Sequence, residues 1–276
     1  MHWFKALPLL ILASPVWAAD GYVIGVGAEA DTGDGVAGSL SGEVGITKTT
    51  WLSATLAKSS VDLPRRMSVD TLYGDVGIEH WFDPVGIRLA VAYWGDSDIL
   101  DSKDVRAALY WRNDKVSISG DYEYREFTFD IFRDTLRPGQ DFQFHANGAG
   151  LSARFSLSDR VDLSLSGMDY DYNVDLKRAA NRDILDFLSV SRLSLINSLI
   201  DYRARIGLGF DVGERRWSLD FSTSKGEADG STTNSTTLRF LTPLGSKSDI
   251  EFGLGIDNSD NYGKATFLSV FIYFYG

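Results

Sequence analysis

The chain has 276 residues, a formal net charge of −11 at pH 7 and no cysteine. The acidity argues against nucleic acid as a partner, and the lack of cysteine excludes a disulfide framework and a cysteine-ligated metal. Gly is frequent at 27 residues, Pro is sparse at 6, and 7 Trp, 12 Tyr and 16 Phe are many for an acidic chain. This composition is more typical of strands with aromatic girdles than of a helical globule.

Residues 1–18 are predicted to be a cleaved secretory signal peptide. His2 and Lys5 precede a short apolar run at 6–13, and Val16-Trp17-Ala18 stands directly before the predicted cut. The run is too short to cross a membrane as a helix, and no later window offers about 18 uninterrupted apolar residues. We therefore expect residues 19–276 to form a single domain that is not a bundle of membrane-spanning helices.

Fourteen segments of the remaining chain alternate between apolar and polar residues, which is the pattern of a β-strand with two different faces. Their apolar faces, in chain order, lie within 22–28, 40–46, 52–56, 72–78, 85–93, 105–111, 116–124, 149–155, 161–165, 202–210, 217–221, 238–240, 250–256 and 268–274.

The opposite faces of these segments are polar, small or charged. A soluble β-sandwich would have to bury the apolar face against a second sheet, whereas a membrane barrel points it at lipid. The sequence therefore predicts an all-β fold, a transmembrane antiparallel up-and-down β-barrel. The predicted pore-lining residues are Glu29, Glu43, Asp75, Glu79, Arg88, Arg106, Asp121, Glu123, Arg154, Arg203, Arg205, Asp220, Arg239 and Glu251.

The connections between the segments alternate in length. Every second one is short (47–50, 82–84, 113–115, 158–160, 212–215 and 242–246), and most of the others are longer (31–36, 59–70, 95–103, 126–141, 171–199, 226–232 and 258–262). Short periplasmic turns and longer extracellular loops are the pattern of outer-membrane barrels. The alternation requires an even number of strands; we predict fourteen, with twelve or sixteen as alternatives.

One loop departs from the strand pattern. Within 176–187, apolar residues recur among Lys177, Arg178 and Arg182 at a helical period, so we expect a partly helical loop near 174–199. Whether it covers the mouth, folds into the lumen or lies at the outer interface stays open.

The predicted lumen has a charge pattern of its own. Arginines gather on the fifth to tenth segments, and acids gather on the thirteenth, first, second and fourth. Closing the barrel would set a basic wall against an acidic one, and such charges select solutes in a pore. The alternative is a structural network that fills the interior. Because barrels of about eight strands are filled by side chains and wider ones are not, fourteen strands favour a water-filled lumen.

The stretch Phe144-His145-Ala146-Asn147-Gly148 resembles the H-x-S-N-G stretch of outer-membrane phospholipases and lipid A deacylases. That resemblance implies a serine nucleophile activated by the histidine. Ala146 follows His145 here and the stretch contains no serine, so a lipid-modifying hydrolase using His145 is kept only as an alternative. We expect no enzyme activity, and therefore no catalytic residue.

Aspartates recur near the expected outer rim, at Asp31 and Asp34, at Asp96, Asp98, Asp101 and Asp104, and at Asp257 and Asp260. Clustered carboxylates can hold divalent cations, but none of these runs has the spacing of a calcium loop. We interpret them as solvated loop charge and expect no metal site and no cofactor.

The last segment, 263–276, reads G-K-A-T-F-L-S-V-F-I-Y-F-Y-G, with Leu268 and Phe274 on one face and Phe267 and Phe271 on the other. In water such a strand would be an adhesive edge, which closure in a bilayer removes. It resembles the terminal aromatic strand that serves bacterial outer-membrane β-barrels as an assembly signal, although there an aromatic residue is usually last and here Gly276 follows Tyr275.

The resemblance implies a Gram-negative outer-membrane protein that meets the barrel-assembly machinery during insertion, and membrane lipids and lipopolysaccharide afterwards. In length and strand count the chain is similar to the monomeric fourteen-strand porins, in architecture only. We therefore expect a monomer that lets small hydrophilic solutes or ions diffuse through a charged lumen. A closed structural or adhesion barrel is a further alternative.

Overall fold

The computed structural model describes residues 21–63, 67–96, 100–129, 142–174, 199–261 and 263–276. These residues form fourteen strands: β1 (Tyr22–Asp31), β2 (Gly35–Thr47), β3 (Thr50–Leu63), β4 (Met67–Trp81), β5 (Val85–Asp96), β6 (Leu100–Arg112), β7 (Val116–Phe129), β8 (Phe142–Ser158), β9 (Val161–Tyr172), β10 (Ile200–Val212), β11 (Arg215–Gly226), β12 (Thr232–Gly245), β13 (Ser248–Ser259) and β14 (Gly263–Tyr275).

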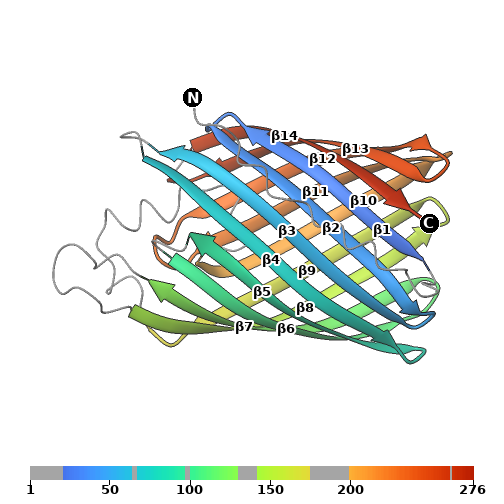
Figure 1. The fold of residues 1–276 in the computed structure, drawn as a ribbon, viewed down its shortest axis with the longest axis horizontal. Coiled ribbons are helices and arrows are strands. Elements are labelled where there is room, and N and C mark those ends of the chain that lie inside the picture. The colour runs from blue at the N-terminus through green and yellow to red at the C-terminus, as the bar shows by residue number, and fades with distance from the viewer. Residues whose placement is uncertain (1–20, 64–66, 97–99, 130–141, 175–198, 262) are drawn as a thin grey trace.

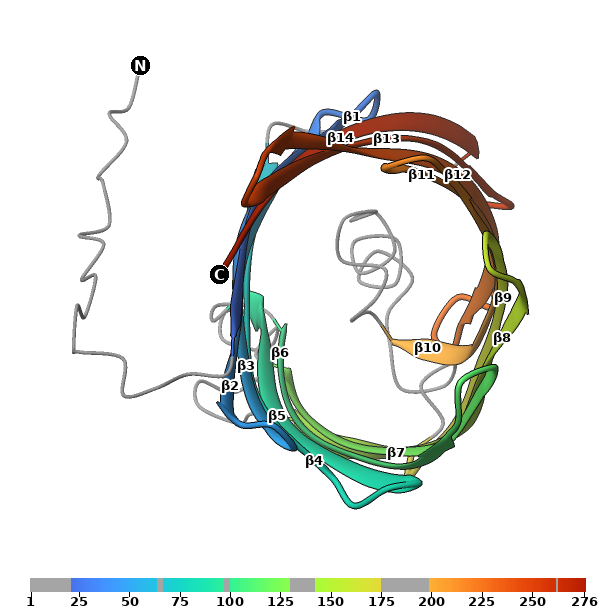
Figure 2. The same ribbon diagram turned by 90° about the vertical axis from the view of Figure 1, so that its right-hand side faces the viewer.

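Each strand pairs antiparallel with the next one along the chain, and β1 pairs with β14 to close a barrel (Figures 1 and 2). The closure is sealed where the described chain begins and ends, because the Tyr22 and Gly276 backbones exchange hydrogen bonds of 3.0 and 3.2 Å. The predicted fold class and strand number are confirmed. Since all strands of the described residues belong to one closed sheet, none of them forms a second sheet over the apolar face.

The connections have the predicted alternation in length. Tight turns join β2 to β3, β4 to β5, β6 to β7, β8 to β9, β10 to β11 and β12 to β13, all at the end of the barrel where β1 begins. We call this the short-turn end and the opposite one the loop end. In the β6–β7 turn, the Asn113 side-chain oxygen accepts hydrogen bonds from the backbone nitrogens of Lys115 (2.9 Å) and Val116 (2.8 Å), which is how Asn reverses a chain in a tight turn.

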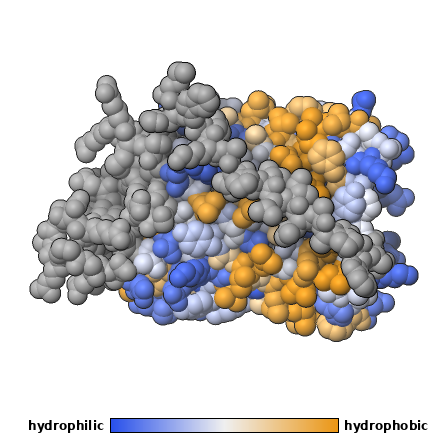
Figure 3. All heavy atoms as spheres, in the orientation of Figure 1, coloured by the Kyte–Doolittle hydropathy of each residue, from blue (hydrophilic) through white to orange (hydrophobic). Residues whose placement is uncertain are grey.

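The predicted apolar faces join into one outer band. Val26 pairs with Leu40 on one side and Ile272 on the other, and Leu89 pairs in the same way with Ile78 and Ala107. These side chains are exposed, with Leu89 at 50%. Figure 3 shows the band on the half of the barrel nearer the short-turn end, with hydrophilic side chains beyond it. Such a band is stable when acyl chains cover it.

Several strands are longer at the loop end than predicted. Residues 59–63, 67–70, 100–103 and 126–129 were expected in loops and belong to β3, β4, β6 and β7. Their outward side chains lack the apolar pattern, because this half of the barrel projects beyond the apolar band. Asp104, expected to be solvated loop charge, is consequently a buried residue of β6.

The two segments with irregular patterns are strands. β9 keeps one phase through Gly167, which pairs with Leu151 and Ala204 on the outer face. In β12 the register shifts between Pro243 and Gly245, since Pro lacks the N–H that a regular ladder needs. The predicted helix at 176–187 lies outside the described residues. Among the described residues, no helix is long and apolar enough to cross a membrane.

Replacing Leu89 by Arg tests the assignment of the outer face. We expect Leu89→Arg to lower the free energy of unfolding in lipid by about 2–4 kcal/mol, because it places a cation in the apolar band. Ala90 is the next residue, and its side chain points into the lumen. Ala90→Arg should therefore lower the free energy of unfolding much less. Urea titrations of both variants refolded into liposomes measure the difference, and equal losses would contradict the assignment.

Candidate functional site

Charged residues line the inner face of the barrel. All fourteen predicted pore-lining side chains fall on the inward phase of their strands, opposite to the exposed apolar residues. Their identity as functional residues stays a prediction. What the structure adds is the set of partners that each one meets.

The most buried group of charges centres on Glu123 of β7, and we call it the Glu123 cluster. Glu123 accepts hydrogen bonds from Arg106 (3.0 Å), Arg203 (3.3 Å) and the Tyr170 hydroxyl (2.7 Å). Asp104 accepts from Arg106 at 3.2 Å and from Arg125 at 3.4 Å. Glu123 and Arg125 are 3% and 1% exposed. Mutual pairing is what makes burial of this many charges tolerable.

Aromatic side chains continue this wall towards the loop end. Phe127 stacks on Phe144 with ring centroids 4.8 Å apart, and Tyr172 lies beyond both rings. Leu199 and Ile200, just before and at the start of β10, belong to the same buried cluster. Figure 2 shows this end of β10 leaning into the barrel. The aromatic cluster and the start of β10 therefore project into the lumen from β6 to β10, and they narrow it on this side.

Two further groups of charges lie along the wall. Glu79 on β4 binds Arg88 at 2.6 Å and accepts a hydrogen bond from the Tyr110 hydroxyl at 2.6 Å. Asp220 on β11 receives both Arg205 and Arg239 at 2.7 Å. These groups use neighbouring strands, so each cation is neutralised beside its own position rather than across the lumen.

A fourth group uses residues near the short-turn end. Asp162 on β9 pairs with Arg154 at 3.0 Å and also with Arg216, which in turn binds Asp211 at 2.9 Å. Asp75 and Asp121 each accept a hydrogen bond from a neighbour on their own strand, Tyr73 and Ser119.

The sequence predicted a basic wall that faces an acidic wall across the lumen. This prediction is wrong for the basic wall. The arginines of β5 to β12 alternate with Asp104, Glu123, Asp162 and Asp220, so this wall is close to neutral. The inner faces of β13, β14, β1, β2 and β3 bear no Lys or Arg within the described ranges, and they bear Glu29, Glu43 and Glu251. The lumen thus has a compensated wall and an acidic wall.

The sequence-based interpretation of the lumen omitted several partners that complete these groups, namely Asp104, Asp162, Arg216 and the hydroxyls of Tyr73, Tyr110 and Tyr170. The signal was available for Asp104, because it is two residues from Arg106 and so shares its face.

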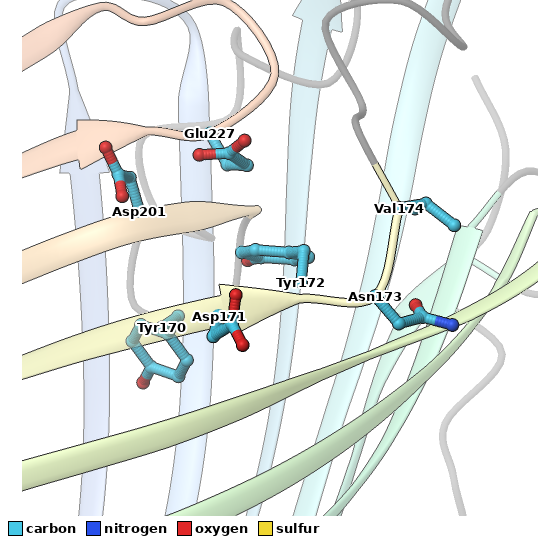
Figure 4. A pocket seen from close by; sticks show the side chains of 7 residues that line it. All are labelled: Tyr170, Asp171, Tyr172, Asn173, Val174, Asp201 and Glu227. Atoms are coloured by element: carbon cyan, nitrogen blue, oxygen red, sulfur yellow. The ribbon is translucent and has the colours of Figure 1, made fainter.

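A cavity of about 380 Å³ lies at the loop end (Figure 4), lined by Tyr170, Asp171, Tyr172, Asn173, Val174, Asp201 and Glu227. Its carboxylates do not converge on one point: Asp201 binds Lys225 at 2.6 Å, and the described residues contain no cluster that could hold a metal ion. The cavity is a candidate site for contact with solutes at the mouth.

His145, the candidate base of the alternative enzyme, lies on the outer face of β8. Its ring is 5.7 Å from that of Tyr124, and its backbone N–H donates to the Asn173 side chain at 2.8 Å. Within the described part of the chain, no Ser or Thr hydroxyl is bonded to the His145 ring. The geometry offers no assembled nucleophile.

Comparison with solved structures places this architecture among known barrels. The CymD monoaromatic hydrocarbon channel aligns over 92% of this chain and 88% of its own, with a TM-score of 0.57 at 10% identity. The anion-selective porin from Comamonas acidovorans and the KdgM porin align with TM-scores of 0.49 and 0.48, both at 10% identity, over 94% and 91% of this chain and 99% and 98% of theirs.

No family model and no curated protein sequence matches the chain. At 10% identity the structural likeness shows the fold alone, and it agrees with the predicted resemblance to outer-membrane porins in architecture. Together with the apolar band, it identifies the chain as a transmembrane β-barrel of the outer-membrane type.

Proposed function

We propose that the barrel is a channel of the Gram-negative outer membrane through which small hydrophilic solutes or ions diffuse passively. The observation that carries this proposal is the width of the barrel combined with its polar interior. Side chains fill a barrel of about eight strands, whereas larger ones enclose cavities or channels. Fourteen strands with Arg, Asp and Glu on the inner wall favour water inside, because carboxylates such as Glu43 are exposed there.

The channel acts as a monomer in this proposal, since one chain closes the barrel by itself. Residues 1–18 are removed on export, and the barrel-assembly machinery inserts residues 19–276. Lipids and lipopolysaccharide then surround the apolar band. Cleavage is checked by N-terminal sequencing of the mature protein.

Liposome swelling tests the transport proposal. Liposomes that contain the folded protein should swell in small sugars and amino acids, with rates that fall as solute size rises, because the compensated wall narrows the lumen. The control is liposomes that contain a folded eight-strand barrel. Absence of swelling with the smallest solute would contradict the proposal and favour a closed structural or adhesion barrel.

An assay for released fatty acid distinguishes the hydrolase alternative from the channel. If the purified protein released fatty acid from phospholipid or lipid A, and His145→Ala removed that activity, the enzyme alternative would replace the channel. We expect no release from either protein, because no hydroxyl nucleophile is bonded to the His145 ring within the described residues.

A further inference from the structure

The inner face of β14 carries four aromatic side chains. Tyr275 bonds to Asp249 through its hydroxyl, and the other three, Phe267, Phe271 and Tyr273, we call the aromatic strip. All three are half-buried, and the Phe271 and Tyr273 rings are nearly parallel, at 11°, with centroids 6.3 Å apart. β14 lies across the barrel from β7, and thus faces the compensated wall (Figure 2).

Glycines on the neighbouring strands hold these rings against the wall. Phe271 pairs with Gly27 on β1, and Phe267 pairs with Gly255 on β13. A Cβ at either glycine would overlap the ring, and one at Gly25 would lie 3.2 Å from the Tyr273 ring. Each ring consequently covers glycine backbone with one face. Because the residues are only half-buried, part of each ring remains accessible from the lumen.

On the opposite wall of the barrel, tyrosine rings also cover glycines, but there the rings serve the charge groups. Tyr110 covers Gly86 and Tyr170 covers Gly148, but their hydroxyls are bonded to Glu79 and Glu123. Those rings are part of the charge groups that stabilise the wall. Phe267 and Phe271 have no hydroxyl and so do not join a charge group in this way.

Carboxylates accompany the strip along its length. Phe271 pairs with Glu251, Phe267 pairs with Asp31, and Ser269 between them pairs with Glu29. The nearest arginine is Arg239 on β12, which is bound to Asp220 at 2.7 Å and lies 4.0 Å from Glu251. The surface thus combines partly exposed aromatic rings with negative charge that the neighbouring Arg239 offsets in part.

This combination fits one class of solute. A positively charged group with an apolar surface is attracted to the face of an aromatic ring and gains further from nearby carboxylates. An inorganic ion would gain little from the rings, and the described residues contain no carboxylate cluster of the kind that holds a metal. We propose that the aromatic strip, with Glu29 and Glu251, binds organic cations bearing an ammonium group as they pass through the lumen. The inference rests on the proposed channel.

Choline and 3,3-dimethyl-1-butanol, its neutral carbon analogue, provide a matched pair of probes. Calorimetric titration of the folded barrel in detergent should show binding of choline that weakens as salt rises, since the attraction is partly electrostatic. The neutral analogue should bind at least about tenfold more weakly, because it keeps the shape and loses the charge. Equal binding of the two probes, or no binding of choline, would overturn the proposal.

Variants locate the site. Phe271→Leu should weaken choline binding roughly threefold to thirtyfold, which is the range of a cation–π contact. Glu251→Gln should also weaken it and keeps the side-chain shape, so it serves if Phe271→Leu does not fold. The control is Phe252→Leu. Phe252 follows Glu251 in β13 but lies on the outer face of the barrel, so choline binding should be unchanged. If Phe252→Leu lost choline binding while Phe271→Leu and Glu251→Gln kept it, the assignment of the site to the aromatic strip would be contradicted.

Conductance measured on the same preparation separates this inference from the channel. A barrel that binds choline as described but conducts no ions would contradict the channel and leave the binding site standing. A barrel that conducts ions but binds both probes equally would contradict the binding site and leave the channel standing.

Discussion

Replacing Glu29, Glu43 and Glu251 together by Gln is expected to abolish most of a cation preference that the wild-type channel should show. The inner faces of β13, β14, β1, β2 and β3 bear carboxylates and no Lys or Arg within the described residues, whereas most arginines on the other inner faces are paired with acids beside them. The net field of the lumen therefore comes from the acidic wall, and a ring or wall of one sign selects ions of the other.

The measurement is the reversal potential across a planar bilayer with a tenfold KCl gradient. The wild type should reverse towards the potassium equilibrium potential, and the triple variant should reverse close to zero. The matched control is Glu79→Gln with Arg88→Gln, which removes one acid and its paired cation and should barely move the reversal potential. A wild type that prefers chloride, or an unchanged triple variant, would contradict the acidic-wall assignment.

Replacing Glu123 by Gln is expected to cost about 3 kcal/mol of unfolding free energy, at the lower end of the range for breaking a buried ion pair. The substitution removes the carboxylate charge that Arg106, Arg125 and Arg203 all approach and leaves these three cations close together. The midpoint of urea unfolding in detergent, followed by Trp fluorescence, reports the loss.

Asp121 provides the control for this variant, since it lies two residues away on the same face of β7 and bonds only to Ser119 among the described residues. Asp121→Asn should change the unfolding free energy by no more than about 0.5 kcal/mol, as a partly exposed polar substitution usually does. If both variants lost the same stability, the Glu123 cluster would have no special structural role.

The faces of the strands could be predicted because each strand has one lipid side and one lumen side. Val76 and Ile78 alternate with Asp75 and Glu79, and this period of two survives without any knowledge of pairing. The same criterion failed at 100–103, where β6 extends beyond the apolar band. There the outward positions of β6 lie outside the apolar band and are polar, so the alternation that marks a strand in lipid disappears.

The partners within the lumen could not be predicted from the same pattern. Which arginine meets which acid depends on the register of neighbouring strands, as in Arg203 reaching Glu123 from 80 residues away. The arginines gathered on β5 to β10 therefore suggested a basic wall, although Asp104 and Asp162 stand among them. Likewise Phe271 and Gly27 are far apart in sequence and adjacent only because β14 closes on β1.

Single-channel recording tests the central claim, an open water-filled lumen, most directly. Folded protein added to a planar bilayer in symmetrical KCl should produce discrete, uniform current steps whose size grows with salt concentration. If protein shown to be folded and inserted gave no steps at any voltage, the lumen would be closed and the account of transport would be contradicted.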